Sequence, residues 1–175
     1  MTTIMKKHTT LPFIGIVLLL VFSSCMADKK PDQAWWLNIS IAPDKTVLNN
    51  INITTYNKNW RSAVFLDEKL IKTHVTKRQF SEFKNSKFKL SSNVDLNGNN
   101  EKETIKVGVY QNSKNDKGIF LAVFEKHKLL KVFTDSSNQG FSALIKDNKS
   151  IRWYKCMNCG EYEHINWNGK SYVIQ

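Results

Sequence analysis

The chain has 175 residues, a formal net charge of +11 and 41% hydrophobic residues, enough apolar material for one folded domain with its own core. The positive charge favours anionic partners and membranes, although solvated lysines scattered over the surface would give the same total. Nucleic acid is disfavoured as a partner. Readers of phosphate and guanine prefer arginine, and the only arginines here are Arg61, Arg78 and Arg152.

The first 24 residues have the pattern of an export signal. The basic pair Lys6-Lys7 precedes an apolar run over residues 11–22, and two small serines stand directly before Cys25. This ending resembles the lipobox of bacterial lipoproteins, which implies cleavage of a signal peptide, residues 1–24, and acylation of the Cys25 thiol. An ordinary cleaved signal is the alternative. A retained membrane helix is disfavoured, because a span needs about 20 apolar residues.

The cysteine count favours lipidation as well. Three cysteines in an exported chain leave one thiol unexplained, whereas a lipid on Cys25 leaves Cys156 and Cys159 as a pair for an oxidising compartment. Met26 follows Cys25 in place of the aspartate that retains enteric-type lipoproteins in the inner membrane. The predicted location is therefore the cell envelope, on the periplasmic face of the outer membrane.

The predicted organisation is a signal peptide over residues 1–24, a lipidated terminus and tether over residues 25–34, and a single β-rich domain over residues 35–175. The segment before residue 34 is polar and contains Pro31, as expected of a flexible tether. Without Lys6 and Lys7, the mature chain keeps 24 basic and 15 acidic residues, a net charge of +9.

The first half of the domain predicts short strands and one helix. Apolar and polar residues alternate in several short stretches, which is typical of half-buried strands. Thr76 and Gln79 have the spacing of a capping box, so a short helix is expected over residues 76–85. The expected strands in this half lie at residues 37–41, 51–53 and 63–66.

The second half predicts successive antiparallel hairpins. Residues 119–124 are continuously apolar, as in a central strand that is covered on both faces. Asn168-Gly169 is a strong signal for a tight hairpin turn, because both residues tolerate positive φ. The fold class is therefore predicted as mainly β, an antiparallel meander that is blade-like or a small β-sandwich, with one short helix. The expected strands in this half lie at residues 104–110, 119–124, 130–133, 141–145, 151–154, 162–167 and 172–174.

Oxygen-bearing side chains alternate along residues 95–103, at Asp95, Asn97, Asn99, Glu101 and Glu103. The segment resembles the Asp-x-Asp-Gly-Asp-Gly-x-x-Asp loop of FG-GAP and VCBS-type repeats, the blade units of integrin-α-like propellers. The resemblance implies Ca²⁺ ligation by the side chains of Asp95, Asn97, Asn99 and Glu103 and by the backbone carbonyl of Glu101. Amides in place of two carboxylates lower the charge facing a cation. We therefore expect no cofactor or weak Ca²⁺ binding; the alternative is a metal-free loop shaped by Asx turns.

The segment from Cys156 to Cys159 admits three interpretations. A redox motif should open a helix, and no helix is predicted after it. Structural zinc needs four ligands, and only His164 could join the two cysteines. A disulfide that staples a turn suits an exported domain and is the favoured prediction.

Aromatic residues gather towards the C-terminus. At alternating strand positions such residues are most often core, with one or two exposed at an edge. The candidate binding residues, for a protein or a glycan, are Tyr162, Trp167 and Tyr172. The hairpin from Trp167 to Tyr172 resembles the Trp-x-Gly-x-x-Tyr ending of many small bacterial lipoprotein domains.

Catalytic signatures are absent from the sequence, which has neither a Gly-x-Ser-x-Gly elbow nor a His-Glu-x-x-His pair. Glu161 and Glu163 share a face of a predicted strand, as a glycosidase carboxylate pair would, but solvated charge is favoured. The predicted function is a non-catalytic protein-binding lipoprotein of the envelope, an immunity or inhibitor protein against a periplasmic toxin or wall hydrolase. The alternatives are an envelope enzyme, either a wall hydrolase or a thiol redox protein, and a glycan-binding lipoprotein.

Overall fold

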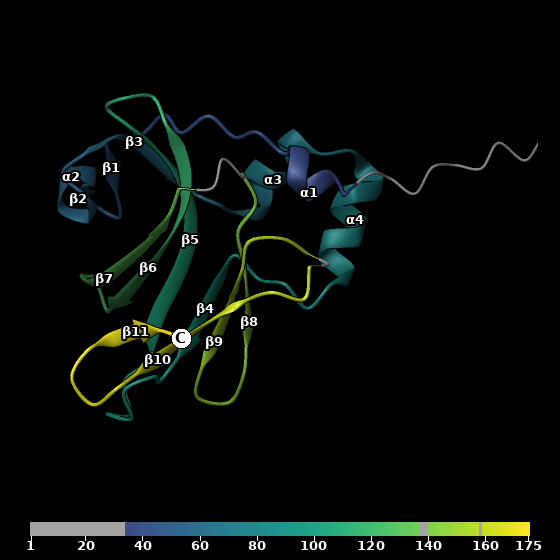
Figure 1. Ribbon diagram of the computed structural model, residues 1–175. Coiled ribbons are helices and arrows are strands. Elements are labelled where there is room, and N and C mark those ends of the chain that lie inside the picture. The colour runs from purple at the N-terminus through teal and green to yellow at the C-terminus, as the bar shows by residue number, and fades with distance from the viewer. Residues whose placement is uncertain (1–33, 137–139, 158) are drawn as a thin grey trace, which may run out of the picture. The chain divides into compact units, whose positions relative to one another are not determined.

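A computed structural model describes residues 34–136, 140–157 and 159–175, which belong to one compact unit, Asp32–Gln175. The predicted signal peptide, Cys25 and the tether up to residue 33 lie outside the described residues. Two antiparallel sheets and a small hairpin dominate this unit (Figure 1). The mainly β, antiparallel fold class is thereby confirmed.

The larger sheet has five strands in the order β3-β5-β6-β7, with β4 paired to the same edge of β5 as β3. Strand β5 can serve both neighbours because it is long: β3 lies opposite residues 108–112, and β4 lies opposite residues 103–106. The hairpin between β6 and β7 confirms the predicted pairing of residues 119–124 with 130–133. The strands are β3 Trp60–Phe65, β4 Ser91–Val94, β5 Glu103–Asn112, β6 Lys117–Glu125 and β7 Lys128–Asp135.

The smaller sheet is a meander of consecutive hairpins in the order β11-β10-β9-β8, as predicted. Lys89, just before β4, forms an antiparallel bridge with Leu144 of β8, so the two sheets are joined at this corner. Its strands are β8 Ala143–Lys146, β9 Ile151–Tyr154, β10 Glu163–Trp167 and β11 Tyr172–Ile174. A separate hairpin, β1 Val47–Leu48 and β2 Ile51–Asn52, turns through Asn49 and Asn50, whose φ angles are 50° and 61°.

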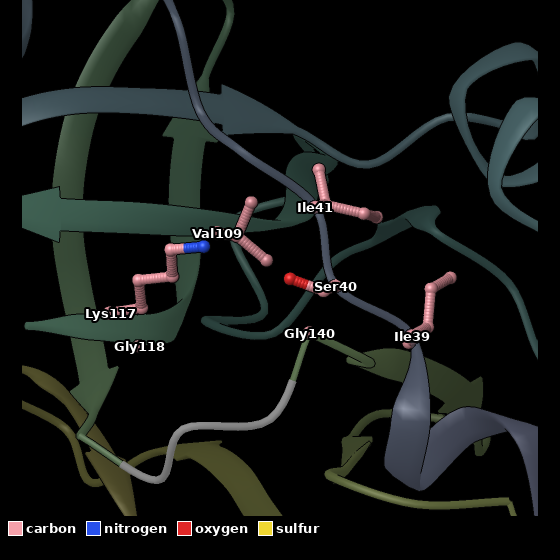
Figure 2. Close-up of a pocket in the computed structure, with 7 residues that line it drawn as sticks. All are labelled: Ile39, Ser40, Ile41, Val109, Lys117, Gly118 and Gly140. Carbon is pink, nitrogen blue, oxygen red and sulfur yellow. The ribbon is translucent and has the colours of Figure 1, made fainter.

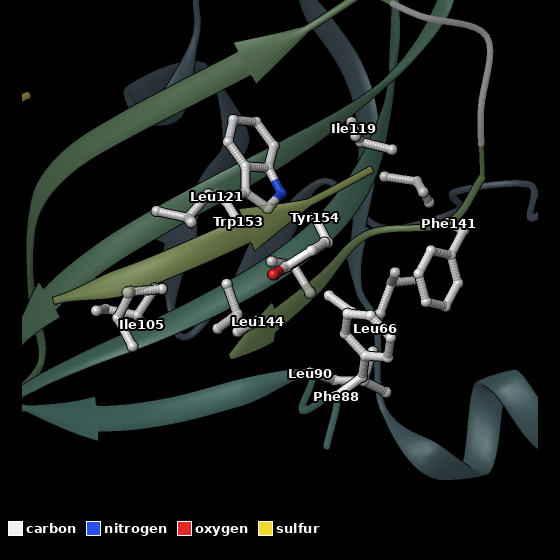
Figure 3. Close-up of a cluster of buried hydrophobic side chains, with 14 of the residues drawn as sticks. Leu66, Phe88, Leu90, Ile105, Ile119, Leu121, Phe141, Leu144, Trp153 and Tyr154 are labelled. Carbon is white, nitrogen blue, oxygen red and sulfur yellow. The ribbon is translucent and has the colours of Figure 1, made fainter. Parts of the chain in front are cut away.

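Strand β6 is buried on both of its faces, which confirms the prediction from its continuous apolar run. On one face Ile119 and Leu121 join a core that the two sheets enclose together with Trp153 and Phe141 (Figure 3). On the other face Phe120, Ala122 and Phe124 pack in a second cluster against α2 (Ile53–Tyr56) and the β1–β2 hairpin. The shared core between the sheets makes the fold a small sandwich.

The predicted helix is confirmed as α4 (Lys77–Asn85). The Thr76 side chain accepts a hydrogen bond from the Gln79 backbone N–H at 3.3 Å, and the Gln79 side chain accepts one from the Thr76 N–H at 2.8 Å. In Figure 1, α1 (Trp35–Asn38), α3 (Glu68–His74) and α4 lie together beside the sheets. None of the helices in the described part of the chain is long and apolar enough to cross a membrane.

Three features of the first half differ from the prediction. The expected strand over residues 37–41 is wrong: α1 buries Trp35 and Trp36 together, and an irregular segment then buries Ile39 and Ile41. The apparent alternation thus came from a non-helical segment that lies on the core. The expected strand residue Ile53 is instead helical, because Asn52 caps α2 by accepting the Thr54 N–H at 2.9 Å.

The number of helices was also underestimated, since four short helices lie among the described residues. Helix α3 carries a signal that was present in the sequence. Asp67 is its N-cap, accepting the Leu70 N–H at 2.7 Å, and Ile71 is fully buried.

Candidate functional site

The oxygens of the acidic loop, residues 95–103, accept hydrogen bonds from the loop's own backbone. The two Asp95 carboxylate oxygens accept the N–H groups of Gly98 at 2.8 Å and Asn100 at 3.0 Å. The side-chain oxygen of Asn97 accepts the Asn99 N–H at 3.0 Å, and that of Asn99 accepts the Glu101 N–H at 2.8 Å. These are the bonds of consecutive Asx turns, so the geometry is compatible with a loop that keeps its shape without a cation.

Glu103, at the start of β5, is fully buried. One of its carboxylate oxygens accepts the Leu96 N–H at 2.8 Å, and the other accepts the Tyr172 hydroxyl at 2.6 Å. The Tyr172 hydroxyl in turn accepts an N–H of the Asn97 side chain at 3.2 Å. Burial and the hydrogen bond to Glu103 raise the pKa of Tyr172. The acidic loop and the C-terminal hairpin, predicted as separate candidate sites, are therefore fastened to each other.

A hollow of about 330 Å³ opens where these two elements meet. Trp167 and Tyr172 form one side, with ring centroids 4.9 Å apart, and Leu130 of β7 adds apolar surface. Lys131 and Lys170, both exposed, bring positive charge to it. The remaining lining residues are Asn97, Glu125 and Ser171.

The hairpin that carries Trp167 and Tyr172 is confirmed, with the strand ends that the sequence predicts. Trp167 pairs with Tyr172, so the loop between them has four residues. Only Gly169 of the Asn168-Gly169 pair has positive φ, at 89°. The Asn168 side chain instead accepts the N–H groups of Lys170 at 3.0 Å and Ser171 at 2.9 Å. This turn places Lys170 on the hollow.

Tyr162, the third candidate binding residue, lies outside this hollow. Its side chain is 42% exposed and stacks under the Arg152 guanidinium, whose carbon is 5.2 Å from the ring centroid. Arg152 is held in place by two hydrogen bonds to Asp147, at 2.8 and 3.0 Å. The ring of His164 lies edge-on to Tyr162, at 5.0 Å. The three predicted aromatics therefore divide between two surfaces.

The structure pairs Cys156 with Cys159 in a disulfide, with Cα atoms 5.9 Å apart, which is compatible with the favoured prediction. Cys156 and Met157 are buried in the core between the sheets, while Cys159 is exposed. No helix begins at this turn in the described chain, and the ring of His164 lies against Tyr162.

The expectation that both Glu161 and Glu163 are solvated is wrong for Glu163. Its carboxylate accepts the Lys155 ammonium at 2.7 Å, and Lys155 also pairs with Asp135. Burial alone would lower the pKa of Lys155, but its bonds to the two carboxylates outweigh this and raise it. Glu163 therefore belongs to an ion pair that ties β10 to the strand end of β7.

A much smaller hollow lies between the segment Ile39–Ile41 and Gly118 and Gly140 (Figure 2). Its volume is about 20 Å³, which is close to the space of one water molecule. A Cβ on Gly140 would collide with the Ile39 carbonyl oxygen, so glycine is what allows these segments to meet. This gap is a packing feature and not a ligand site.

Comparison with known proteins gives no relative: no protein-family model, no curated protein and no solved structure matches the chain. Among the described residues, no group of three or more histidine, cysteine, aspartate or glutamate side chains is placed to hold a metal ion. Sequence reasoning found Trp167, Tyr172 and Asn97, and missed Leu130, Lys131 and Lys170. The turn signal at Asn168-Gly169 could have indicated Lys170 as a site residue, since it places residue 170 in the same loop, next to Trp167 and Tyr172.

Proposed function

We propose that this chain is a non-catalytic protein-binding lipoprotein of the bacterial envelope, anchored through Cys25 on the periplasmic face of the outer membrane. Its partner would be a toxin or a wall hydrolase that it neutralises, as an immunity or inhibitor protein does. The observation that supports binding is the hollow at Trp167, which is lined by the C-terminal hairpin, the β6–β7 hairpin and Asn97 of the acidic loop.

Rigidity of this surface favours recognition. The Tyr172–Glu103–Leu96 bonds fix the acidic loop and the C-terminal hairpin to each other before a partner arrives, so less conformational entropy is lost on binding. Trp167 offers a large aromatic surface inside a concave site, which is the usual setting of an interface residue that dominates the binding energy. Lys131 and Lys170 would steer an acidic partner towards it.

The carboxylates nearest the hollow are already used within the fold, which supports binding over hydrolysis. Glu103 accepts two hydrogen bonds from the protein, and Glu125 accepts one from the Asn99 side chain at 3.2 Å. A general acid or base must reach the substrate, and Glu103 is buried against the Leu96 N–H and the Tyr172 hydroxyl, which leaves Glu125 as the single carboxylate of the lining.

The test is a host strain that lacks the gene and is challenged by kin cells or by the product of a neighbouring gene. The strain should be poisoned, and the intact gene should restore growth. A Lys170→Glu gene should restore growth poorly, because it reverses an exposed charge beside Trp167. Lys149→Glu is the matched control, since Lys149 is also exposed in a hairpin turn but lies outside the hollow.

Unchanged fitness of the deletion strain, together with hydrolase activity of the purified protein, would replace the proposal with the enzyme alternative. Equal rescue by Lys170→Glu and Lys149→Glu would leave an envelope binder but move its binding surface away from this hollow.

A further inference from the structure

A second concave region lies beside the β1–β2 hairpin, on the face of the larger sheet that points away from the core shared by the two sheets. It consists of two adjoining hollows of about 390 and 350 Å³, which share Asn49 and Lys106 in their linings. We name this region the hairpin trough. Its lining residues are Lys45, Val47, Leu48, Asn49, Asn50, Phe65, Leu66, Asp67, Ser91, Thr104, Lys106, Phe124, Lys126 and His127.

Positive charge in the hairpin trough is only partly neutralised. Lys126 pairs with Glu101 at 2.9 Å, and the Asp67 carboxylate is bonded to the Leu70 N–H at 2.7 Å as a helix cap. By contrast, Lys45 and Lys106 form no ion pair with a carboxylate in the described ranges. Two ammonium groups thus line the larger hollow without a salt bridge, against the single carboxylate of Asp67, one oxygen of which accepts the Leu70 N–H.

Contacts with Phe65 and Asn49 order the Lys106 side chain. Its side chain is half-buried, its ammonium nitrogen lies 5.2 Å from the centre of the Phe65 ring, and it donates to the Asn49 side chain at 3.3 Å. Asn49 itself lies in the tight turn of the hairpin, where its backbone adopts φ of 50°. A lysine that is already ordered loses less side-chain entropy when it binds an anion than a freely moving one does.

Apolar surface lies beside these charges. Val47 is 49% exposed on the hairpin, and the half-buried Phe65 lines the larger hollow with it. A ligand that combines an anionic group with a carbon skeleton would therefore match the region better than a bare ion.

We propose that the hairpin trough binds a phosphate-bearing ligand, with the phosphate oxygens on Lys45 and Lys106. A phosphate ester carries one or two negative charges and several acceptor oxygens, so it can satisfy two ammonium groups at once. The side-chain N–H groups of Asn49, whose oxygen accepts from Lys106, supply further donors. A soluble phosphate ester and a phospholipid headgroup share this chemistry.

The test follows backbone amide shifts of the full protein by NMR during titration with inorganic phosphate and, separately, with short-chain soluble phosphatidylglycerol. Sodium chloride at matched ionic strength is the reference for screening. Saturable shifts at Asn49 and Lys106 are the expected result. Tighter binding of phosphatidylglycerol identifies the ligand as a headgroup, and tighter binding of phosphate identifies it as a soluble phosphate.

The double variant Lys45→Gln with Lys106→Gln should weaken binding by roughly tenfold or more, because two charged contacts are lost. Lys114→Gln is the matched control, since Lys114 is exposed on the β5–β6 loop and lies outside the hairpin trough. If replacing Lys106, which contacts the Phe65 ring, disturbs the fold, the single variant Lys45→Gln still tests the site. Binding that is absent for both ligands, or equal in the Lys45 variants and the control, would overturn the proposal.

Discussion

The acidic loop and the cysteine turn, Cys156–Cys159, are both tight loops that the sequence marks clearly, yet they are stabilised in different ways. The acidic loop depends on hydrogen bonds that converge on its own backbone and on a buried carboxylate, Glu103. The cysteine turn depends on a covalent bond and on burial of Cys156 and Met157 in the core. Hydrogen bonds that converge on a loop can therefore fix it as a disulfide does, provided that its carboxylate oxygens find donors.

The largest effect is expected at Glu103, where the acidic loop is most dependent on one side chain. Glu103→Leu leaves the Leu96 N–H and the Tyr172 hydroxyl without acceptors in a buried place. The free energy of unfolding should fall by about 2–6 kcal/mol, because two buried donors lose their acceptor and each costs about 1–3 kcal/mol. Urea denaturation measures it.

Glu101→Gln is the control for this change, since Glu101 lies in the same loop in an exposed pair with Lys126. Its effect on the free energy of unfolding should be far smaller, because solvent screens an exposed ion pair. Equal losses in the two variants would show that the buried carboxylate does not hold the loop.

Tyr172→Phe removes one of the two bonds to Glu103 and should cost about 2 kcal/mol at neutral pH, as for hydrogen bonds to charged groups. Burial and Glu103 raise the pKa of Tyr172 above its ordinary value of 10.0, so the folded state keeps the hydroxyl protonated where the unfolded state loses its proton. The contribution of the Tyr172 hydroxyl to the free energy of unfolding is therefore complete below pH 10 and declines as the pH rises above it.

Urea denaturation of both proteins at pH 8 and at about pH 11 tests this coupling, because lysine titration is common to the two chains and cancels in their difference. The stability gap between the intact protein and Tyr172→Phe should narrow at the higher pH. A gap that stays constant would mean that the hydroxyl is not buried against Glu103.

Much of the sheet could be predicted from local sequence, because β6, the β8–β9 hairpin and the capping box of α4 carry their signals in adjacent residues. The candidate site could be predicted only in pieces. Trp167 and Asn97 were each singled out, but their proximity depends on the contact between Glu103 and Tyr172, which are 69 residues apart. No periodicity encodes such a contact. The prediction of a strand over residues 37–41 was wrong for the same reason, since the alternation of apolar and polar residues there reflects burial of Ile39 and Ile41 against distant parts of the chain.

The cysteine turn should respond less than the acidic loop. Cys159→Ser removes the disulfide without disturbing the core, because Cys159 is exposed. The free energy of unfolding should fall by about 1 kcal/mol. This is at the low end of the roughly 0–5 kcal/mol by which disulfides stabilise proteins, since a bond that closes a short loop constrains few unfolded conformations. Thermal unfolding measures it. Cys156→Ser is the contrasting variant and should cost more, because it also places a hydroxyl in the core.

The smallest effect is expected from Ca²⁺ on the acidic loop. A cation that used the oxygens of Asp95, Asn97 and Asn99 would have to displace the backbone N–H groups that they accept, and would meet the Lys126 ammonium beside Glu101. With amides in place of two carboxylates, we expect a dissociation constant for Ca²⁺ of about 1 mM or weaker. The weakest class of calcium sites in proteins has dissociation constants of roughly 10⁻⁴–10⁻³ M. At about 1 mM Ca²⁺ this gives a stabilisation of roughly 0.4 kcal/mol and a rise of about 1 °C in Tm. Mg²⁺ at the same concentration and Asp95→Asn are the controls. Calorimetry that gave sub-micromolar affinity would mean that the Asx turns yield to the cation, and that the loop is a metal site.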